Sequence, residues 1–123
     1  MYTIDCSKQK PNLTEGNIMQ TTTFKGVATT VRQENNGWLI GRYQQTDVAA
    51  RQHEHIHLNT GGWFTLTTKR RMNQFAYQFC DNAFSVYQKN YQWFVRIHAT
   101  DESISFNGNT LNFDLPISMK LAA

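Results

Sequence analysis

The feature that most constrains the fold of this chain is the placement of two Asn-Gly dipeptides among segments of strand character. Asn36-Gly37 follows residues 19–33, which are rich in threonine and valine, and precedes residues 38–45. Asn107-Gly108 divides residues 103–116. Because Asn-Gly is strongly favoured in two-residue hairpin turns, each dipeptide predicts a hairpin of two antiparallel strands.

Other segments also have strand patterns. Residues 84–98 predict a hairpin that turns at Lys89-Asn90, and residues 53–60 alternate between polar and apolar side chains. Residues 46–52 fit neither a helix nor a strand clearly. Alternate residues of a strand share a face, so the two later hairpins should direct these side chains into the core: Phe84, Val86, Trp93, Val95, Ile97, Ile104, Phe106, Leu111, Phe113 and Leu115.

One segment has the periodicity of a helix. The pattern predicts a helix over residues 68–80 that packs on the sheet. Its N-cap is expected at Thr67 or Thr68, because a threonine hydroxyl can accept a hydrogen bond from a backbone N–H of the first turn. The apolar side chains that recur at helical spacing are Met72, Phe75, Ala76 and Phe79.

The chain is therefore expected to be α+β: a mostly antiparallel twisted sheet of roughly six to eight strands with one amphipathic helix packed on it. Charged residues make up only 17% of the sequence, and threonine, asparagine and glutamine take their place, which favours sheet surfaces over helical bundles. A length of 123 residues suits a single domain spanning residues 1–123. Residues 1–18, interrupted by Pro11 and Gly16, are expected to form an irregular arm.

Charge and composition limit the function classes. The net charge of +3 and a pI of about 9.0 are compatible with an anionic partner. No segment approaches 18 consecutive apolar residues, so no contact with a membrane is expected. The first residues lack the apolar region of a secretory signal, which predicts a cytosolic protein with Cys6 and Cys80 reduced.

Three consecutive cations stand at the predicted start of the helix. There they oppose the positive end of the helix dipole, which suggests that they serve an anion. A phosphate could bind backbone N–H groups, threonine hydroxyls and these cations together. The alternative is that the cations extend into water or pair with Asp47 or Glu54. The predicted anion-binding residues are Gly61, Gly62, Thr67, Thr68, Lys69, Arg70 and Arg71.

The outer face of the predicted 84–98 hairpin combines aromatic rings with positive charge. Such a face can stack on nucleotide bases or single-stranded nucleic acid, or form a protein interface. It would instead be a second core layer if the helix covered it. The residues predicted for stacking or interface contacts are Tyr87, Phe94, Arg96 and His98, together with Trp63.

The histidines His53, His55 and His57 alternate along one predicted strand and would share a face. Two imidazoles can ligate zinc or iron, but a stable site needs further ligands, and no sequence spacing ties a carboxylate to these three. They are therefore weak metal candidates, and no cofactor is expected. Nucleophile-elbow, zinc-protease and Cys-x-x-Cys motifs are absent from the sequence, so catalysis is not expected.

A family of small proteins encoded by tailed bacteriophages resembles this chain in three segments: ATTVRQENNGWLIGRYQQTDV, LNTGGWFTLTTKRRMNQF and VYQKNYQWFV. The resemblance spans Thr21 to Val95 and is most specific where Gly-Gly-Trp is followed by Thr-Thr-Lys-Arg-Arg-Met-Asn-Gln. It implies a phage protein that works inside an infected bacterium, and it brings no enzyme activity.

We expect a phage accessory protein that acts by binding in the host bacterial cytoplasm, in counter-defence or host takeover. One class of partner is a polyanion, either nucleic acid or a nucleotide, held at the basic site. The alternative is a host immune or replication factor that the protein inhibits by docking on it. A second alternative is a metal-dependent enzyme that uses the histidine face. An exposed edge strand would also permit homo-oligomers.

Overall fold

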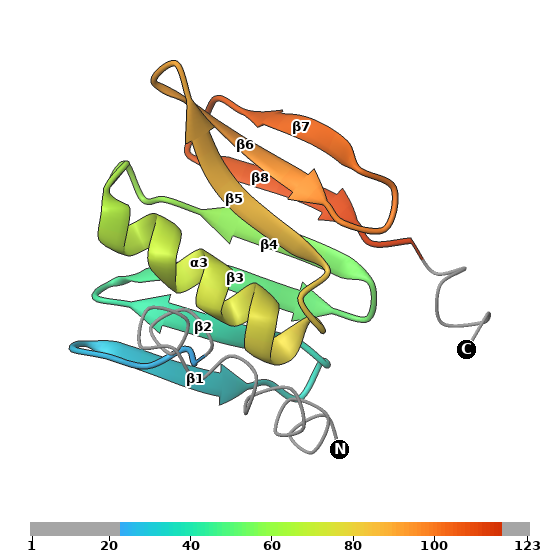
Figure 1. Ribbon diagram of the computed structural model, residues 1–123. Helices are drawn as coiled ribbons and strands as arrows, with labels where there is room; N and C mark the ends of the chain where they lie inside the picture. The colour runs from blue at the N-terminus through green and yellow to red at the C-terminus, as the bar shows by residue number, and fades with distance from the viewer. Residues whose placement is uncertain (1–22, 117–123) are drawn as a thin grey trace, which may run out of the picture.

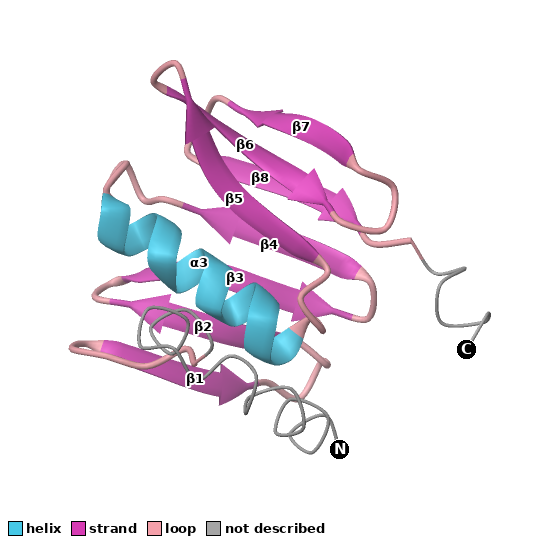
Figure 2. Cartoon of the chain, viewed as in Figure 1, coloured by secondary structure: helices cyan, strands magenta, loops and turns pink. Residues whose placement is uncertain are grey.

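One helix and eight strands make up the part of the chain that the computed structural model describes, residues 23–116 (Figure 1; Figure 2). The α+β prediction is confirmed, and the predicted arm 1–18 lies outside the described residues. Within residues 23–116, no helix has the length and apolar character needed to cross a membrane. In chain order the elements are β1 (Thr29–Gln33), β2 (Leu39–Tyr43), β3 (Thr46–Gln52), β4 (His55–Asn59), α3 (Leu66–Phe79), β5 (Phe84–Lys89), β6 (Gln92–Ile97), β7 (Glu102–Phe106) and β8 (Thr110–Asp114).

The strands form two antiparallel sheets. The larger has the order β1-β2-β3-β4-β8, and the smaller has the order β5-β6-β7. Figure 1 shows α3 and the three-stranded sheet over the same face of the five-stranded sheet, with β5 beside α3. No other element of residues 23–116 covers the opposite face, which we call the outer face.

The first predicted hairpin is confirmed. β1 pairs with β2 across a turn in which Gly37 has a φ of 95° and donates its N–H to the Glu34 carbonyl at 3.1 Å. Within the described residues, however, β1 starts only at Thr29, because Gly26 and Ala28 have φ values of 151° and 54° that an extended strand excludes. Residues 46–52, which had no clear pattern, form the central strand β3.

The second Asn-Gly prediction is wrong, because β7 and β8 do not pair with each other. β7 pairs with β6, whereas β8 pairs with β4 in the other sheet. A two-residue hairpin turn of the favoured type needs positive φ at both central positions, and neither Asn107 nor Gly108 has it. Because β7 and β8 belong to different sheets, Phe106 on β7 packs against Trp93 while Phe113 on β8 packs against Phe84.

The third hairpin is confirmed with a shift of one residue. β5 pairs with β6, but the turn lies at Asn90-Tyr91, where both φ values are positive. The alternation still places the predicted side chains correctly. Phe84, Val86, Trp93, Val95, Ile97, Phe106, Phe113 and Leu115 are buried, and Ile104 and Leu111 pack against them half-buried.

The helix begins earlier than predicted. Its N-cap is Thr65, whose Oγ1 accepts a hydrogen bond from the backbone N–H of Thr68 at 3.1 Å, and not Thr67 or Thr68. Lys69 is therefore the fourth helical residue, and the other two cations lie in the second turn. The dipole acts mainly within the first turn, so these cations oppose it less than the sequence suggested.

The inner face of α3 is the one predicted. Met72, Phe75 and Ala76 have no exposed surface, and Phe79 is partly buried against the same core. The ring of Phe75 lies edge-on to Phe24, with 5.7 Å between centroids. The helix therefore closes one half of the core, and the three-stranded sheet closes the other.

One side chain of α3 joins these two halves by hydrogen bonds. Asn73 donates from Nδ2 to the carbonyl of Val86 at 2.9 Å, and its Oδ1 accepts from the N–H of Val86 at 2.6 Å. At the edge of β5 that faces the helix, the N–H and the carbonyl of Val86 thus have the hydrogen-bond partners that a neighbouring strand would otherwise supply. This pairing fixes β5 beside α3 and so orients the three-stranded sheet.

Candidate functional site

The loop between β4 and α3 is built from short polar residues and two glycines. Gly61 and Gly62 have φ values of 64° and 89°, a region that residues with a Cβ rarely adopt. Asn59 Oδ1 accepts from the N–H of Gly61 at 2.8 Å, and Thr60 Oγ1 accepts from that of Gly62 at 3.1 Å. A Cβ on Gly61 would also lie 2.5 Å from Thr46 Oγ1. The glycines therefore shape the loop, and their role in the structure is conformational.

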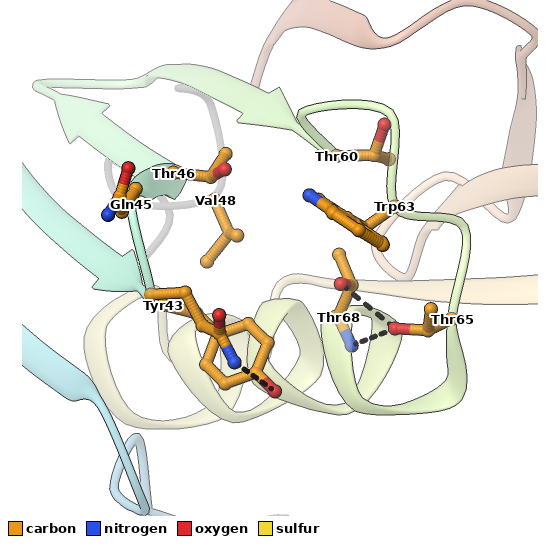
Figure 3. Close-up of a pocket in the computed structure, with 9 residues that line it drawn as sticks. Tyr43, Gln45, Thr46, Val48, Thr60, Trp63, Thr65 and Thr68 are labelled. Carbon is orange, nitrogen blue, oxygen red and sulfur yellow. Dashed lines mark hydrogen bonds between the residues drawn. The ribbon is translucent and has the colours of Figure 1, made fainter.

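A pocket of about 390 Å³ lies beside this loop, at the start of α3 (Figure 3). We call it the helix-start pocket. Figure 3 shows the rings of Tyr43 and Trp63 on opposite sides, with the Thr65 and Thr68 side chains along the helix. Trp63 is 67% exposed. The lining residues are Tyr43, Gln44, Gln45, Thr46, Val48, Thr60, Trp63, Thr65 and Thr68, and none is charged.

The pocket adjoins uncommitted hydrogen-bond donors of the helix. The first intrahelical bond runs from the N–H of Lys69 to the Thr65 carbonyl, and the N–H of Thr68 is capped by Thr65. Within the described residues, no group accepts from the N–H groups of Leu66 and Thr67. Unpaired N–H groups at a helix start attract oxygen atoms of anions.

Two of the three cations point away from each other. Lys69 lies 5.5 Å from the ring centroid of Trp93, on the side of the three-stranded sheet. Arg71 lies 5.5 Å from the ring centroid of Tyr43, and its Nε donates to Thr29 Oγ1 at 3.0 Å. The structure thus gives both cations contacts with the fold. It does not bring them to one anion.

Arg70 is the third cation, and it makes no hydrogen bond or ion pair with another residue in the range 23–116. It follows Leu66 by four positions and Thr67 by three, so it shares their face of the helix. Long helical side chains lean toward the N-terminus. The Arg70 side chain therefore lies on the side of α3 that carries Leu66 and Thr67, and it does not line the helix-start pocket. Asp47, the partner suggested by the sequence, pairs with Arg32 and Arg42 instead.

Three apolar side chains protrude beside the pocket. Trp63, Phe64 and Leu66 are 67%, 46% and 62% exposed, and we call them the apolar trio. The Phe64 ring packs edge-on against Trp93, with 5.3 Å between centroids. Exposed apolar groups this close in sequence are characteristic of binding surfaces.

The predicted stacking face of the 84–98 hairpin is largely occupied by its own contacts. The Tyr87 and Phe94 rings stack on one another with 5.5 Å between centroids, and both are partly buried. Arg96 pairs with Asp101. His98 contacts the Asn82 carbonyl at 2.6 Å and Ser85 Oγ at 3.1 Å. Trp63, predicted to act together with these residues, lines the helix-start pocket instead.

The three histidines do not form one face. His53 lies in the β3–β4 turn with a φ of 54°, because the chain reverses before β4 begins. His55 and His57 are on β4, where both contact Asn112 of β8. Among residues 23–116, no group of three histidine, cysteine or acidic side chains is arranged to hold a metal ion.

Stability is expected to depend weakly on pH through His55. A hydrogen bond to Asp114, 2.8 Å from Nδ1, raises the pKa of His55 above its ordinary value near 6.5. A raised folded-state pKa stabilises the fold fully below the unfolded pKa, and that contribution is lost as pH rises through the folded pKa. The effect should be small because the His55 side chain is 39% exposed.

Urea denaturation from about pH 6, below the ordinary histidine pKa, up to about pH 9 measures this contribution. The free energy of unfolding should fall slightly across the range in the wild type, and this slope should disappear in Asp114→Asn. His53→Gln is the control, because His53 lies in the β3–β4 turn, where no carboxylate of residues 23–116 is hydrogen-bonded to its ring. An unchanged slope in Asp114→Asn would show that another group titrates.

Cys80 is unsuited to nucleophilic chemistry at neutral pH. Its thiol is buried at the end of α3, and burial raises its pKa to about 12. The reactive form of cysteine is the thiolate. A thiol with this pKa stays protonated and serves as a small core side chain.

Several pocket residues had no signal in the sequence. Tyr43, Gln44 and Gln45 stand at the β2–β3 turn, far from the loop in sequence. That turn contains no glycine or proline, and Gln44 adopts a φ of 59°. Thr65 could have been identified, because it precedes Thr68 by the three residues typical of a capping side chain.

Similarity to known proteins indicates the origin of this chain. No curated protein and no solved structure matches the chain. A family model described as Kyanoviridae Gp96 protein matches residues 11–113, a wider span than the Thr21–Val95 resemblance. The match covers most of the chain and confirms the phage resemblance. This protein therefore belongs to the Kyanoviridae Gp96 family of phage proteins.

Proposed function

We propose that this phage protein acts by binding in the cytoplasm of the infected bacterium, and that the helix-start pocket receives a nucleotide or one nucleotide unit of single-stranded nucleic acid. The observation that carries the proposal is the position of Trp63. Its exposed indole forms one wall of a 390 Å³ pocket at the start of a 14-residue helix. A base and a phosphate would then find suitable surroundings side by side.

The aromatic walls suit a nucleobase. Trp63 and Tyr43 contribute aromatic rings on opposite sides of the pocket, and Gln45 and Thr46 contribute an amide and a hydroxyl group from the β2–β3 turn and the start of β3 (Figure 3). Stacking of a base on an aromatic side chain contributes about 1–3 kcal/mol. Uncharged donors and acceptors can pair with the edges of a base without the cost of burying a charge.

The helix start suits the phosphate. The N–H groups of Leu66 and Thr67 can donate to phosphate oxygens, and Arg70 can add a positive charge from the same helical face. In this arrangement only Arg70 of the three cations serves the anion. Lys69 and Arg71 support the neighbouring rings of Trp93 and Tyr43.

Binding without catalysis is the simplest use of such a pocket. Its lining offers no histidine, carboxylate, lysine or cysteine to act as a general base or a nucleophile. A phage protein that retains nucleotides or single strands would withdraw them from host defence or host replication. Counter-defence or host takeover by sequestration is therefore our proposed role.

Fluorescence anisotropy with a labelled single-stranded oligonucleotide and with a labelled mononucleotide tests the proposal. Trp63→Ala should weaken binding about 10- to 100-fold, the loss expected for one stacked base. Arg70→Glu should also weaken it, and should flatten the decline of affinity between about 50 and 200 mM salt. Both variants should keep the wild-type melting temperature, because both side chains are exposed or free of partners.

Arg96→Glu is the matched charge reversal on the Tyr87–Phe94 face. It should bind like the wild type. If Arg96→Glu loses binding while Arg70→Glu does not, the nucleotide site is on that face. No binding of either ligand by the wild type at low salt would refute the nucleotide proposal.

A second candidate function is docking on a host protein, and the apolar trio favours it. Leu66 is 62% exposed next to the pocket but does not line it. Leu66→Ala would remove apolar contact area and leave the pocket intact. Nucleotide binding should then persist, whereas affinity for a protein partner that covers the trio should fall.

A further inference from the structure

A groove of about 470 Å³ crosses the outer face of the five-stranded sheet. Ile40 and Ala50 are neighbours on β2 and β3 and form its floor. Gly41, the residue after Ile40, is on the core-facing side of β2, since a Cβ on Gly41 would lie 2.9 Å from Phe75 of α3. Adjacent residues of a strand point to opposite faces. Ile40 and Ala50 therefore face away from the helix, and the small alanine leaves the depression.

The groove is close to electrically neutral. Asp47 on its rim is held by Arg32 at 3.0 Å and by Arg42 at 3.5 Å. Glu34 is held by Arg32 at 3.2 Å. Two carboxylates therefore meet two guanidinium groups. Such a surface attracts neither a phosphate nor a free metal cation.

A hydrogen-bonded chain fixes the orientation of His57. Asn112 Oδ1 lies 3.2 Å from His55 Nε2 and 2.8 Å from His57 Nδ1, and His55 Nδ1 lies 2.8 Å from Asp114. An amide oxygen only accepts hydrogen bonds, so His57 Nδ1 must carry a proton. In neutral His57 the lone pair is then on Nε2. No group of the described residues contacts that atom, so the groove has an open acceptor.

Three asparagines supply donors. Asn36 Oδ1 accepts from the N–H of Trp38 at 3.3 Å, Asn59 Oδ1 accepts from that of Gly61 at 2.8 Å, and Asn112 is anchored by the histidines. In each case the side-chain amide oxygen accepts a hydrogen bond from another residue of the protein. Their Nδ2 groups have no partner within residues 23–116. Three anchored amides thus offer free donors along one groove.

Trp38 adds an aromatic surface at one end. Its ring is partly buried and stands edge-on to the His55 ring, with 6.1 Å between centroids. The face of an aromatic ring carries partial negative charge and attracts the polarised C–H groups of a ligand. The groove therefore combines an apolar floor, an aromatic wall, free donors and a free acceptor, and both of its carboxylates are paired.

From these features we propose that the outer face of the five-stranded sheet binds a neutral saccharide. Hydroxyl groups both accept and donate, so they match the asparagine amides and His57 Nε2 together. The C–H faces of a sugar ring match Trp38 and the Ile40–Ala50 floor. The site is separate from the helix-start pocket, and it stands whether or not nucleotides bind there.

A microarray of neutral oligosaccharides, probed with the full chain, tests the proposal. The wild type should retain at least one oligosaccharide. Ala50→Ile should lower its affinity for that oligosaccharide about tenfold or more, because the added side chain fills the depression. Thr30→Ile is the control, since it adds an apolar side chain on exposed β1, outside the groove.

Trp38→Ala gives an independent test should Ala50→Ile not fold, and it should also lose about tenfold or more in affinity, since both stacking and contact area are removed. Retention of no neutral oligosaccharide by the wild type overturns the proposal. Wild-type affinity in a folded Ala50→Ile or in Trp38→Ala overturns it as well, because the sugar would then sit elsewhere.

Discussion

Replacing Phe75 by alanine is expected to lower the free energy of unfolding by about 3–5 kcal/mol, as full truncation of a core phenylalanine does. The Phe75 ring has no exposed surface and lies 5.7 Å from the Phe24 centroid and 5.2 Å from that of Phe79. It also packs over Gly41, where no side chain could move into the space left behind. The cavity would therefore remain largely unfilled. Urea denaturation measures the loss.

Phe64→Ala is the matched control for this prediction. Phe64 is 46% exposed and has one aromatic contact, with Trp93, so its truncation should cost about 1 kcal/mol. A near-zero change for Phe75→Ala would mean that the helix does not pack on the sheet through this side chain. Equal losses for the two variants would mean that Phe64 is also part of the core.

Elements with a repeated pattern could be predicted from the sequence. The 3.6-residue spacing of Met72, Phe75 and Ala76 identified the buried face of α3, since burial selects apolar residues at that period. The same reasoning with a period of two identified the core face of β5 and β6. Both patterns are local, and the contacts between elements do not alter them.

Strand partners could not be predicted in the same way. Asn107-Gly108 marks a reversal of the chain, but the partner of each flanking strand depends on which sheet edge is open. β6 offers an edge to β7, and β4 offers one to β8. Those edges exist only once the rest of the fold is assembled, so no dipeptide could specify them.

In the candidate site, too, local features could be predicted from the sequence, whereas contacts between distant elements could not. Lys69, Arg70 and Arg71 are adjacent in sequence, and a helix separates neighbours by about 100° around its axis. Their divergence onto Trp93, solvent and Tyr43 follows from the position of the cap at Thr65. The opposite wall of the helix-start pocket comes from the β2–β3 turn, and only the folded sheet brings it there.

Removing the side chain of Asn73 is expected to be the second most damaging change. Asn73→Ala would leave both the N–H and the carbonyl of Val86 without a partner on the helix side, where Val86 is only 3% exposed. Loss of two hydrogen bonds at a buried strand edge should lower the free energy of unfolding by about 2–4 kcal/mol. Urea denaturation measures the total, and amide hydrogen exchange of Val86 should become much faster.

The sign of the change in the free energy of unfolding distinguishes the two possible roles of Asn73. Alanine has a higher helix propensity than asparagine, so Asn73→Ala would stabilise α3 by a few tenths of a kcal/mol if the side chain had no role. Asn35→Ala in the β1–β2 turn is the control, because Asn35 is exposed and should change stability by less than about 0.5 kcal/mol. A stabilised Asn73→Ala with unchanged exchange at Val86 would show that β5 keeps its place through side-chain packing alone. A loss confined to Asn73→Ala, with faster exchange at Val86, would establish that one asparagine holds the two halves of the core in register.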